Sequence, residues 1–268
     1  MKLGISSYTF SWSVGVPGSE PETPWDELML LSKAAELEVD CLQIADNLPL
    51  HRMKEQRLLA LKERAGEYGI ELEVGARCMN IEMLNRYLDI AGMLGSSILR
   101  FVIDGPGFKP SVKEVTRIVR DAVPELEKRG IRLAIENHER LLAREFLEIV
   151  HGVQSDHVGI CLDSVNSMGA GEGIETVTTL LASCTFNLHI KEFIVKRHPH
   201  MMGFTIEGRP VGRGQLPLEW MLAQLGPRCR SAILELWTPP EETLERTRAR
   251  EAEWAMESIK YLKNNYFQ

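Results

Sequence analysis

The chain has 268 residues, of which 44% are hydrophobic and 26% are charged, so a disordered or collagen-like chain is excluded. The net charge of −7 makes it a poor candidate for binding a nucleic-acid backbone. No apolar run approaches about 18 residues, and the N-terminal residues lack the continuous apolar stretch of a signal peptide, so neither membrane insertion nor secretion is expected. Five cysteines without a Cys-x-x-Cys pair indicate reduced thiols and a cytoplasmic location.

Short apolar runs rich in strand-forming residues recur along the chain. Several are apolar on both faces, which is typical of a parallel sheet covered by helices. The pattern predicts eight strands, over residues 2–9, 40–45, 70–76, 97–103, 131–137, 157–163, 186–193 and 231–237.

Amphipathic stretches between these runs predict helices. Thr23 is expected to cap the first, and residues 111–114 read as a capping box for another. The strand–helix alternation predicts an α/β fold, a (β/α)8 TIM barrel in which residues 1–268 form a single domain. A doubly wound open sheet is the alternative, weakened because no Gly-x-Gly-x-x-Gly follows the first strand. The predicted helices are 25–38, 53–68, 81–94, 111–130, 139–153, 173–181, 218–225 and 241–262.

Four successive predicted strands carry an acid or an imidazole near their C-terminal ends. These residues are Glu136, Asp163, His189 and Glu235. Each alone reads as a buried polar residue, but the carboxyl ends of barrel strands meet at one mouth. Three carboxylates meeting there without a cation would repel one another strongly. Together with the imidazole they predict a site for one divalent metal ion: Mn²⁺, Mg²⁺, Co²⁺ or Zn²⁺.

The order Glu, Asp, His, Glu on strands five to eight resembles the xylose-isomerase-like TIM barrel superfamily, the sugar phosphate isomerase/epimerase family. Residues 211–216 are similar to its Gly-x-Gly segment, and His-x-Lys-Glu at 189–192 is similar to its His-x-Lys-Asp. The resemblance covers the whole chain. It implies a divalent-metal-dependent isomerase or epimerase acting on a sugar or a sugar-derived keto acid through a metal-stabilised enediolate. Glu136 and Glu235 would then also move protons.

Other side chains are candidate contacts to the substrate. Lys191 and His138 lie two residues after a predicted ligand and so share its inward face. Lys191 could hold a substrate oxyanion as a catalytic group, or form a salt bridge within the barrel. Asn166 stands where many epimerases carry a histidine. Trp237, with Tyr8 and neighbouring aromatic residues, could wall the pocket.

The connection after the seventh strand is rich in cations. Residues 195–216 hold six basic or imidazole side chains and one acid, Glu207. This composition favours a cationic lid over an anionic substrate, with an ordinary exposed loop as the alternative. Arg197 is the expected carboxylate anchor, and His198 and His200 are further candidate substrate contacts.

Several functions remain open. The same enediolate forms when CO₂ leaves a 3-oxo acid, and residues 43–50 and 201–204 resemble decarboxylases of oxidised branched sugars such as 3-oxo-isoapionate decarboxylase. An inosose-type dehydratase and a non-catalytic sugar-binding barrel are further alternatives. An endonuclease IV-like phosphodiesterase would need a His-rich trinuclear zinc cluster, which His51, His198 and His200 do not reproduce. The expected partner is a small-molecule sugar or sugar acid, without nucleic acid or membrane, and a homo-oligomer is a possible assembly.

Overall fold

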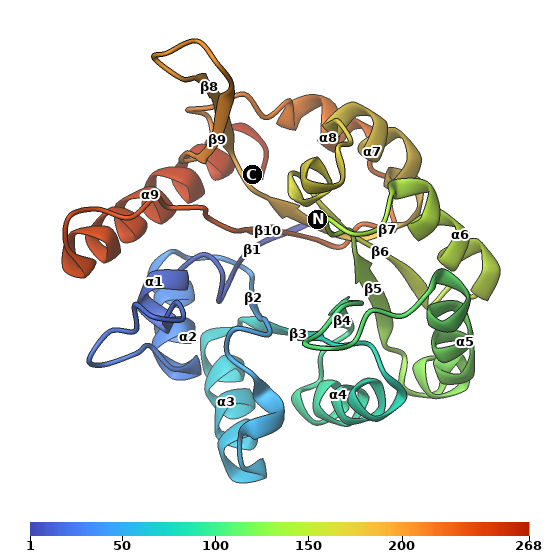
Figure 1. Ribbon diagram of the computed structural model, residues 1–268. Helices are drawn as coiled ribbons and strands as arrows, with labels where there is room; N and C mark the ends of the chain where they lie inside the picture. Colours follow the sequence, from blue (N-terminus) through green and yellow to red (C-terminus); the bar gives the residue numbers. More distant parts are fainter. Residues whose placement is uncertain (268) are drawn as a thin grey trace.

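The structure is a computed structural model that describes residues 1–267, and its centre is a closed barrel of parallel strands (Figure 1). Each strand pairs with its neighbours in chain order, and β10 closes the ring against β1. This arrangement confirms the predicted (β/α)8 barrel and excludes the open sheet. The barrel strands are β1 (Lys2–Ser6), β2 (Cys41–Ile44), β3 (Glu71–Arg77), β4 (Ile98–Val102), β5 (Arg132–Glu136), β6 (Val158–Asp163), β7 (Thr185–Ile190) and β10 (Ser231–Leu234).

Helices surround the barrel, and local signals fix their ends. Ser111 forms the predicted capping box with Glu114. The prediction that Thr23 caps the first long helix is wrong, because Asp26 accepts hydrogen bonds from the amides of Leu28 and Met29. The helices are α1 (Ser11–Val14), α2 (Glu27–Glu36), α3 (Glu55–Tyr68), α4 (Ile81–Leu94), α5 (Val112–Arg129), α6 (Ala143–Val153), α7 (Ile174–Leu181), α8 (Leu218–Gln224) and α9 (Leu244–Asn265), with short 3₁₀ turns at Leu50–Arg52, Asn166–Ala170 and Ala182–Cys184. Within residues 1–267, no helix combines the length and apolar character needed to cross a bilayer.

The barrel strands are buried on both faces. Every residue of β6 and β7 is buried, because helices cover the outside and side chains fill the inside. Polar side chains nevertheless enter this interior, among them Gln43, Glu73 and Asn187. Buried polar groups are costly unless they form hydrogen bonds, so we expect these side chains to be hydrogen-bonded to one another inside the barrel.

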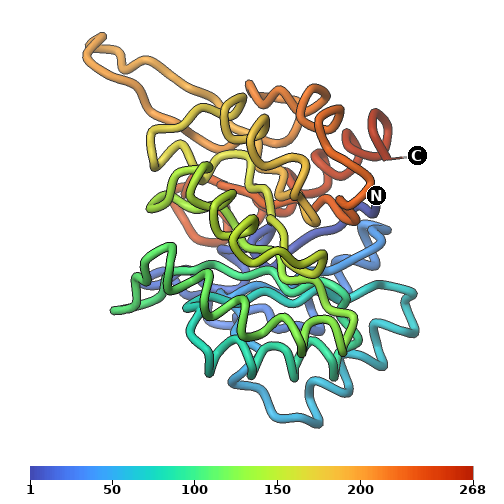
Figure 2. The backbone as a smooth tube through the Cα atoms, turned by 90° about the vertical axis from the view of Figure 1, so that its right-hand side faces the viewer, coloured from blue at the N-terminus to red at the C-terminus, as the bar shows by residue number. Residues whose placement is uncertain are grey.

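The connection after β7 has secondary structure that the sequence analysis does not predict. It contains an antiparallel hairpin of β8 (Phe193–Arg197) and β9 (Phe204–Gly208). The hairpin extends beyond the barrel on the side away from the chain termini (Figure 2). Directly opposed residues such as Val195 and Ile206 share one exposed apolar face, while Lys196 pairs with Glu207 on the other.

Helix α9 anchors the connection that follows β1. Glu251 on α9 accepts hydrogen bonds from the backbone amides of Trp12 and Ser13, at 2.9 and 3.1 Å, and from the Ser13 hydroxyl at 3.0 Å. Burial outweighs these hydrogen bonds and raises the pKa of Glu251 to about 7. A buried carboxyl therefore holds the segment that lies beside the barrel mouth.

This pairing predicts a pH-dependent stability. The folded pKa of Glu251 is raised from 4.5 to about 7, so its contribution to the free energy of unfolding is full below pH 4.5 and is lost as pH rises to about 7. The loss amounts to roughly 1–3 kcal/mol. Between pH 5 and pH 8, Glu251→Gln should therefore gain about that much relative to the unsubstituted protein in urea titrations. Glu253→Gln, on an exposed residue of the same helix, is the control and should show no such gain.

Candidate active site

Four side chains meet at the carboxyl end of the barrel. The Nδ1 atom of His189 lies 3.5–3.7 Å from one carboxylate oxygen of each of three acids. All four are buried and come from the ends of β5, β6 and β7 and from the residue after β10. The structure thus brings together the four residues predicted as metal ligands: Glu136, Asp163, His189 and Glu235.

Local hydrogen bonds aim two of the carboxylates. Asp163 Oδ1 accepts the amides of Val165 and Asn166 at 2.9 and 2.8 Å, which leaves Oδ2 directed toward His189. Glu235 Oε1 accepts the Ser6 hydroxyl at 2.9 Å. The chain turn after β6 and the end of β1 therefore position the acids before any ligand binds.

A buried amide orients His189. Gln43 uses its Nε2 to donate to Glu73 Oε2 at 2.9 Å and to Asn187 Oδ1 at 3.1 Å. Its Oε1 therefore faces His189 Nε2, 2.8 Å away, and accepts a hydrogen bond from Nε2–H. This network assigns the ring proton of His189 to Nε2 and leaves a lone pair on Nδ1.

That lone pair is the clearest sign that the site fits a metal ion. Among the residues that the structure describes, His189 Nδ1 is buried without a hydrogen-bond partner and faces three carboxylates. An imidazole whose second nitrogen is fixed by a hydrogen bond is the usual arrangement at metal sites. The donor set, three carboxylates and one imidazole, fits a divalent cation.

Two buried cations accompany the acids. Lys191 Nζ lies 2.7 Å from Asp163 Oδ2 and 2.9 Å from Glu235 Oε2. Arg100, on β4, forms ion pairs with Glu136 and, at 2.5 Å, with Asp46. Burial would lower the pKa of Lys191 and of Arg100, but the facing carboxylates outweigh it and raise both, so both stay charged.

The same contacts keep two of the acids ionised. Burial would raise the pKa of Asp163, but the Lys191 ammonium outweighs it and holds that pKa below its usual range. Burial acts in the same direction on Glu235, and the facing cations Lys191 and Arg100 lower its pKa. Both carboxylates are therefore anionic at neutral pH and available to a cation.

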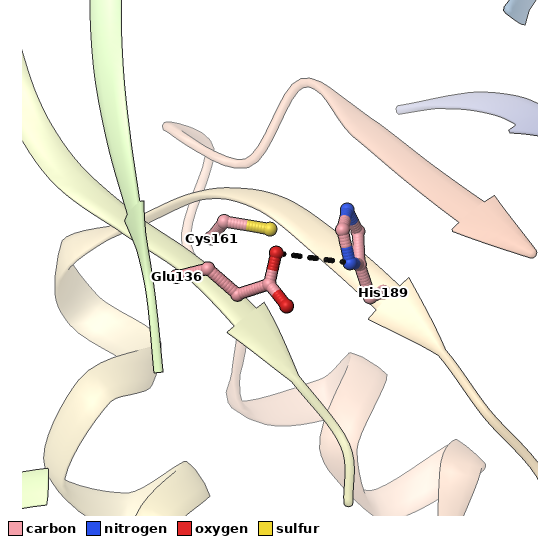
Figure 3. A group of neighbouring side chains, drawn as sticks. All are labelled: Glu136, Cys161 and His189. Atoms are coloured by element: carbon pink, nitrogen blue, oxygen red, sulfur yellow. Dashed lines mark ion pairs between the residues drawn. The ribbon is translucent and has the colours of Figure 1, made fainter. Parts of the chain in front are cut away.

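A cysteine lies beside the cluster. Figure 3 shows Cys161 next to Glu136 and His189, and ligand atoms of the three lie within 4.8 Å of one another. The thiol donates to Asn187 Oδ1 at 3.1 Å. Burial, with Glu136, raises the pKa of Cys161 well above its usual range, and a protonated thiol is a poor ligand. Cys161 is thus a weaker candidate ligand than the four residues above.

A cavity of about 510 Å³ opens over the cluster. Four predicted contact residues line it: Lys191, Asn166, His138 and Trp237. Asn166 donates to Glu136 at 2.8 Å, and His138 pairs with Glu139. Arg77 and Arg100, which the sequence analysis did not select, also line it. A charged residue within the apolar run of β4 was the signal for Arg100, because arginine is rarely buried unless it is paired.

The predicted lid residues lie elsewhere. Arg197 stacks on Phe204, with its guanidinium carbon 4.4 Å from the ring centroid, and donates to the Met201 carbonyl at 2.9 Å. His198 stacks on His200. None of Arg197, His198 and His200 lines the cavity, because strand pairing carries the hairpin away from the mouth. The structure therefore does not bring these three predicted contacts to the site.

The other lid cations are engaged in ion pairs. Lys196 and Arg209 share Glu207, each at 2.9 Å, and Arg213 pairs with Glu257 at 2.6 Å. These pairs neutralise much of the positive charge that the sequence places in this connection.

Two of the family-like motifs have a structural explanation. Glu192, of the His-x-Lys-Glu segment, accepts the backbone amides of Leu216 and Gly212 at 2.8 and 3.1 Å. A Cβ at Gly214 would lie 2.2 Å from the carbonyl oxygen of Phe193, so only glycine fits there. These hydrogen bonds tie the Gly-x-Gly segment to the His-x-Lys-Glu segment. Glu192 therefore stabilises the end of β7, where His189 and Lys191 lie.

The fold and these motifs agree with comparisons to known proteins: the chain belongs to the xylose isomerase-like TIM barrel family, whose model matches residues 31–265. The 3-oxo-isoapionate decarboxylase of Pectobacterium atrosepticum is 32% identical over 264 residues, which cover 98% of this chain and 95% of that protein. D-psicose 3-epimerase, solved in the presence of D-fructose, matches over the full length of both chains with a TM-score of 0.74 and 15% identity. The IOLI protein with a bound zinc atom also matches over both full lengths, with a TM-score of 0.66 and 17% identity.

These comparisons confirm the predicted family and the prediction that the chain is an enzyme. The solved structures are too distant in sequence to show more than the fold.

The orientation of His189 generates a prediction about metal binding. Gln43→Leu removes the acceptor for Nε2–H and should weaken Mn²⁺ binding by roughly 10- to 100-fold, because the imidazole loses its fixed tautomer and orientation. Calorimetric titration of the metal-free protein with Mn²⁺ measures this directly. Gln56→Leu, the same change on an exposed residue of α3, should leave the affinity unchanged. A folded Gln43→Leu protein with unaltered affinity would contradict this role of Gln43.

Proposed function

We propose that the protein is a divalent-metal-dependent decarboxylase of a 3-oxo sugar acid. One observation carries this proposal: a buried cation holds each carboxylate that an epimerase would use as a base. Glu136 is paired with Arg100, and Glu235 lies 2.9 Å from Lys191.

Epimerisation and decarboxylation make different demands on these carboxylates. Epimerisation requires a base strong enough to remove a proton from carbon, and an ion-paired carboxylate is a weaker base than a free one. In decarboxylation the bond between the carboxylate and the adjacent carbon breaks, and its electron pair moves toward the neighbouring carbonyl. This step releases CO₂ and leaves an enediolate that needs only a proton at carbon, so no side chain has to act as a base.

Each site residue would have a separate role in decarboxylation. Glu136, Asp163, His189 and Glu235 would hold the cation. A divalent cation bound there would polarise the substrate carbonyl and stabilise the negative charge that develops on its oxygen. Lys191 lines the cavity and carries a proton, and a cation bound by Asp163 and Glu235 would weaken the ion pairs that hold this proton. Lys191 would then act as the general acid that protonates the enediolate carbon. Trp237, whose ring centroid lies 5.7 Å from Lys191 Nζ, would form one wall against the substrate.

The cations that line the cavity can face the carboxylate of an acidic substrate. These cations are Arg77, Arg100 and Lys191, and the acids beside them are Asp46, Glu136, Glu139, Asp163 and Glu235. A bound divalent cation would bring the sum of these charges to zero, so the acids would no longer repel a carboxylate. The 32% identity to a 3-oxo-isoapionate decarboxylase, over nearly the whole of both chains, supports the same substrate class.

A sugar isomerase or epimerase is the second candidate. Glu136 and Glu235 approach His189 from different strands, at 3.6 and 3.5 Å, as two bases on opposite sides of a substrate would. This arrangement would support proton transfer on either face if substrate binding released the two carboxylates from their cations.

A substrate panel separates the two candidates. With Mn²⁺ present, 3-oxo sugar acids should yield CO₂ and a ketose in equal amounts, and a chelator should abolish both. In D₂O the product should carry one deuterium, at the carbon that lost CO₂. Epimerised or isomerised ketose formed without CO₂ would overturn the decarboxylase and support the second candidate.

The role of Lys191 can be tested separately. Lys191→Met removes the proton donor and should lower kcat for CO₂ release by roughly 10²- to 10⁴-fold, the range of general acid catalysis. Stopped assays of CO₂ give kcat, and calorimetry should show that Mn²⁺ still binds. Lys196→Met, on the exposed hairpin, is the matched control. Retention of full kcat in Lys191→Met would remove this residue from the mechanism.

A further inference from the structure

The cavity over the cluster continues into a second space, here called the outer chamber. The outer chamber measures about 680 Å³, beside about 510 Å³ for the inner cavity. The two share a wall formed by Tyr8, Ser11, Asp46 and Arg77. Small-molecule pockets commonly span about 300–1,000 Å³, so the inner cavity alone can hold a sugar acid. The outer chamber is additional space that such a substrate does not require.

Two guanidinium groups border the outer chamber. Arg52 lines it and forms no ion pair within residues 1–267. Arg77 is held only loosely, at 3.4 Å from both Asp46 Oδ2 and the Asp104 carbonyl, and its side chain is 43% exposed. Both therefore have N–H donors free for a ligand.

The other titratable groups do not cancel this charge. Asp46 is the one acid among the residues that line the outer chamber, and it is engaged by Arg100 at 2.5 Å. His51 contacts the Tyr87 hydroxyl at 2.9 Å, and burial, with Arg86 and Arg52, lowers its pKa, so the ring is neutral at pH 7. Apolar side chains, including Pro17, Pro49 and Met83, form much of the remaining wall.

We propose that the outer chamber is a second subsite that binds an anionic group, a carboxylate or a phosphate, at the end of the substrate remote from the reacting carbonyl. Arg52 and Arg77 would hold this group, because guanidinium forms paired, charge-assisted hydrogen bonds with either anion. The inference rests on the proposed function in one respect, that the inner cavity takes a sugar acid. It narrows the substrate to a sugar acid with a second negative charge.

Three unreactive compounds of equal carbon number test this subsite. Gluconate carries one anion, glucarate carries a second carboxylate at the far end, and 6-phosphogluconate carries a phosphate there. Calorimetric titration of the Mn²⁺-treated protein should show that glucarate, 6-phosphogluconate or both bind at least tenfold more tightly than gluconate. Which of them gains affinity identifies the anion.

Variants assign the gain to the outer chamber. Arg52→Gln and Arg77→Gln should each reduce the advantage over gluconate severalfold, and Arg52→Lys should recover part of it. Arg213→Gln, on an exposed arginine that lines neither space, should keep the full advantage. Equal affinity for the three compounds, no binding by any of them, or an advantage that persists in Arg52→Gln would overturn the proposal.

The outcome is independent of the reaction. None of the three compounds has a 3-oxo group, so none can be decarboxylated. A clear affinity gain would stand even if no 3-oxo acid released CO₂, and CO₂ release from a simple 3-oxo acid would stand even if the gain were absent.

Discussion

The site depends on the burial of charge at one point inside the barrel. Three carboxylates lie around the free nitrogen of His189, and removing each ion from water costs several kcal/mol unless it is paired. Lys191 and Arg100 supply part of the pairing. The remaining negative charge and the unpartnered Nδ1 are what a divalent cation would satisfy. The proposed ligand set and the two internal cations both follow from this electrostatic requirement.

The layer beneath the cluster serves the same requirement. Gln43, Glu73 and Asn187 form a hydrogen-bonded network inside the barrel, where an apolar layer would pack more simply. Each hydrogen bond in this network limits the orientation of the next side chain. Gln43 Oε1 then accepts from His189 and fixes the ring proton on Nε2. Polar residues therefore replace apolar packing below the site, and they hold the His189 imidazole in a single orientation.

The fold and the four central residues could be predicted because their signals are local. Apolar runs identify strands, and each of the last four barrel strands carries an acid or an imidazole at or near its carboxyl end. Arg100 could not be placed, because its partners Glu136 and Asp46 lie 36 and 54 residues away and only barrel closure brings them together. The position of the predicted lid residues depends on the fold in a similar way. The sequence shows the cationic side chains of residues 195–216, but antiparallel pairing of β8 and β9 decides where these side chains point.

The positions of Arg100 and Lys191 bear on how one scaffold supports different reactions. The strands fix the four proposed cation ligands, so any metal chemistry at this point would change little as long as those residues remain. What can vary is whether Glu136 and Glu235 are free to take a proton from carbon. A guanidinium on β4 and an ammonium after β7 engage both carboxylates, so proton removal becomes harder while loss of CO₂ is unaffected. We infer that charges next to the ligands, rather than the ligands themselves, select between epimerisation and decarboxylation in this barrel.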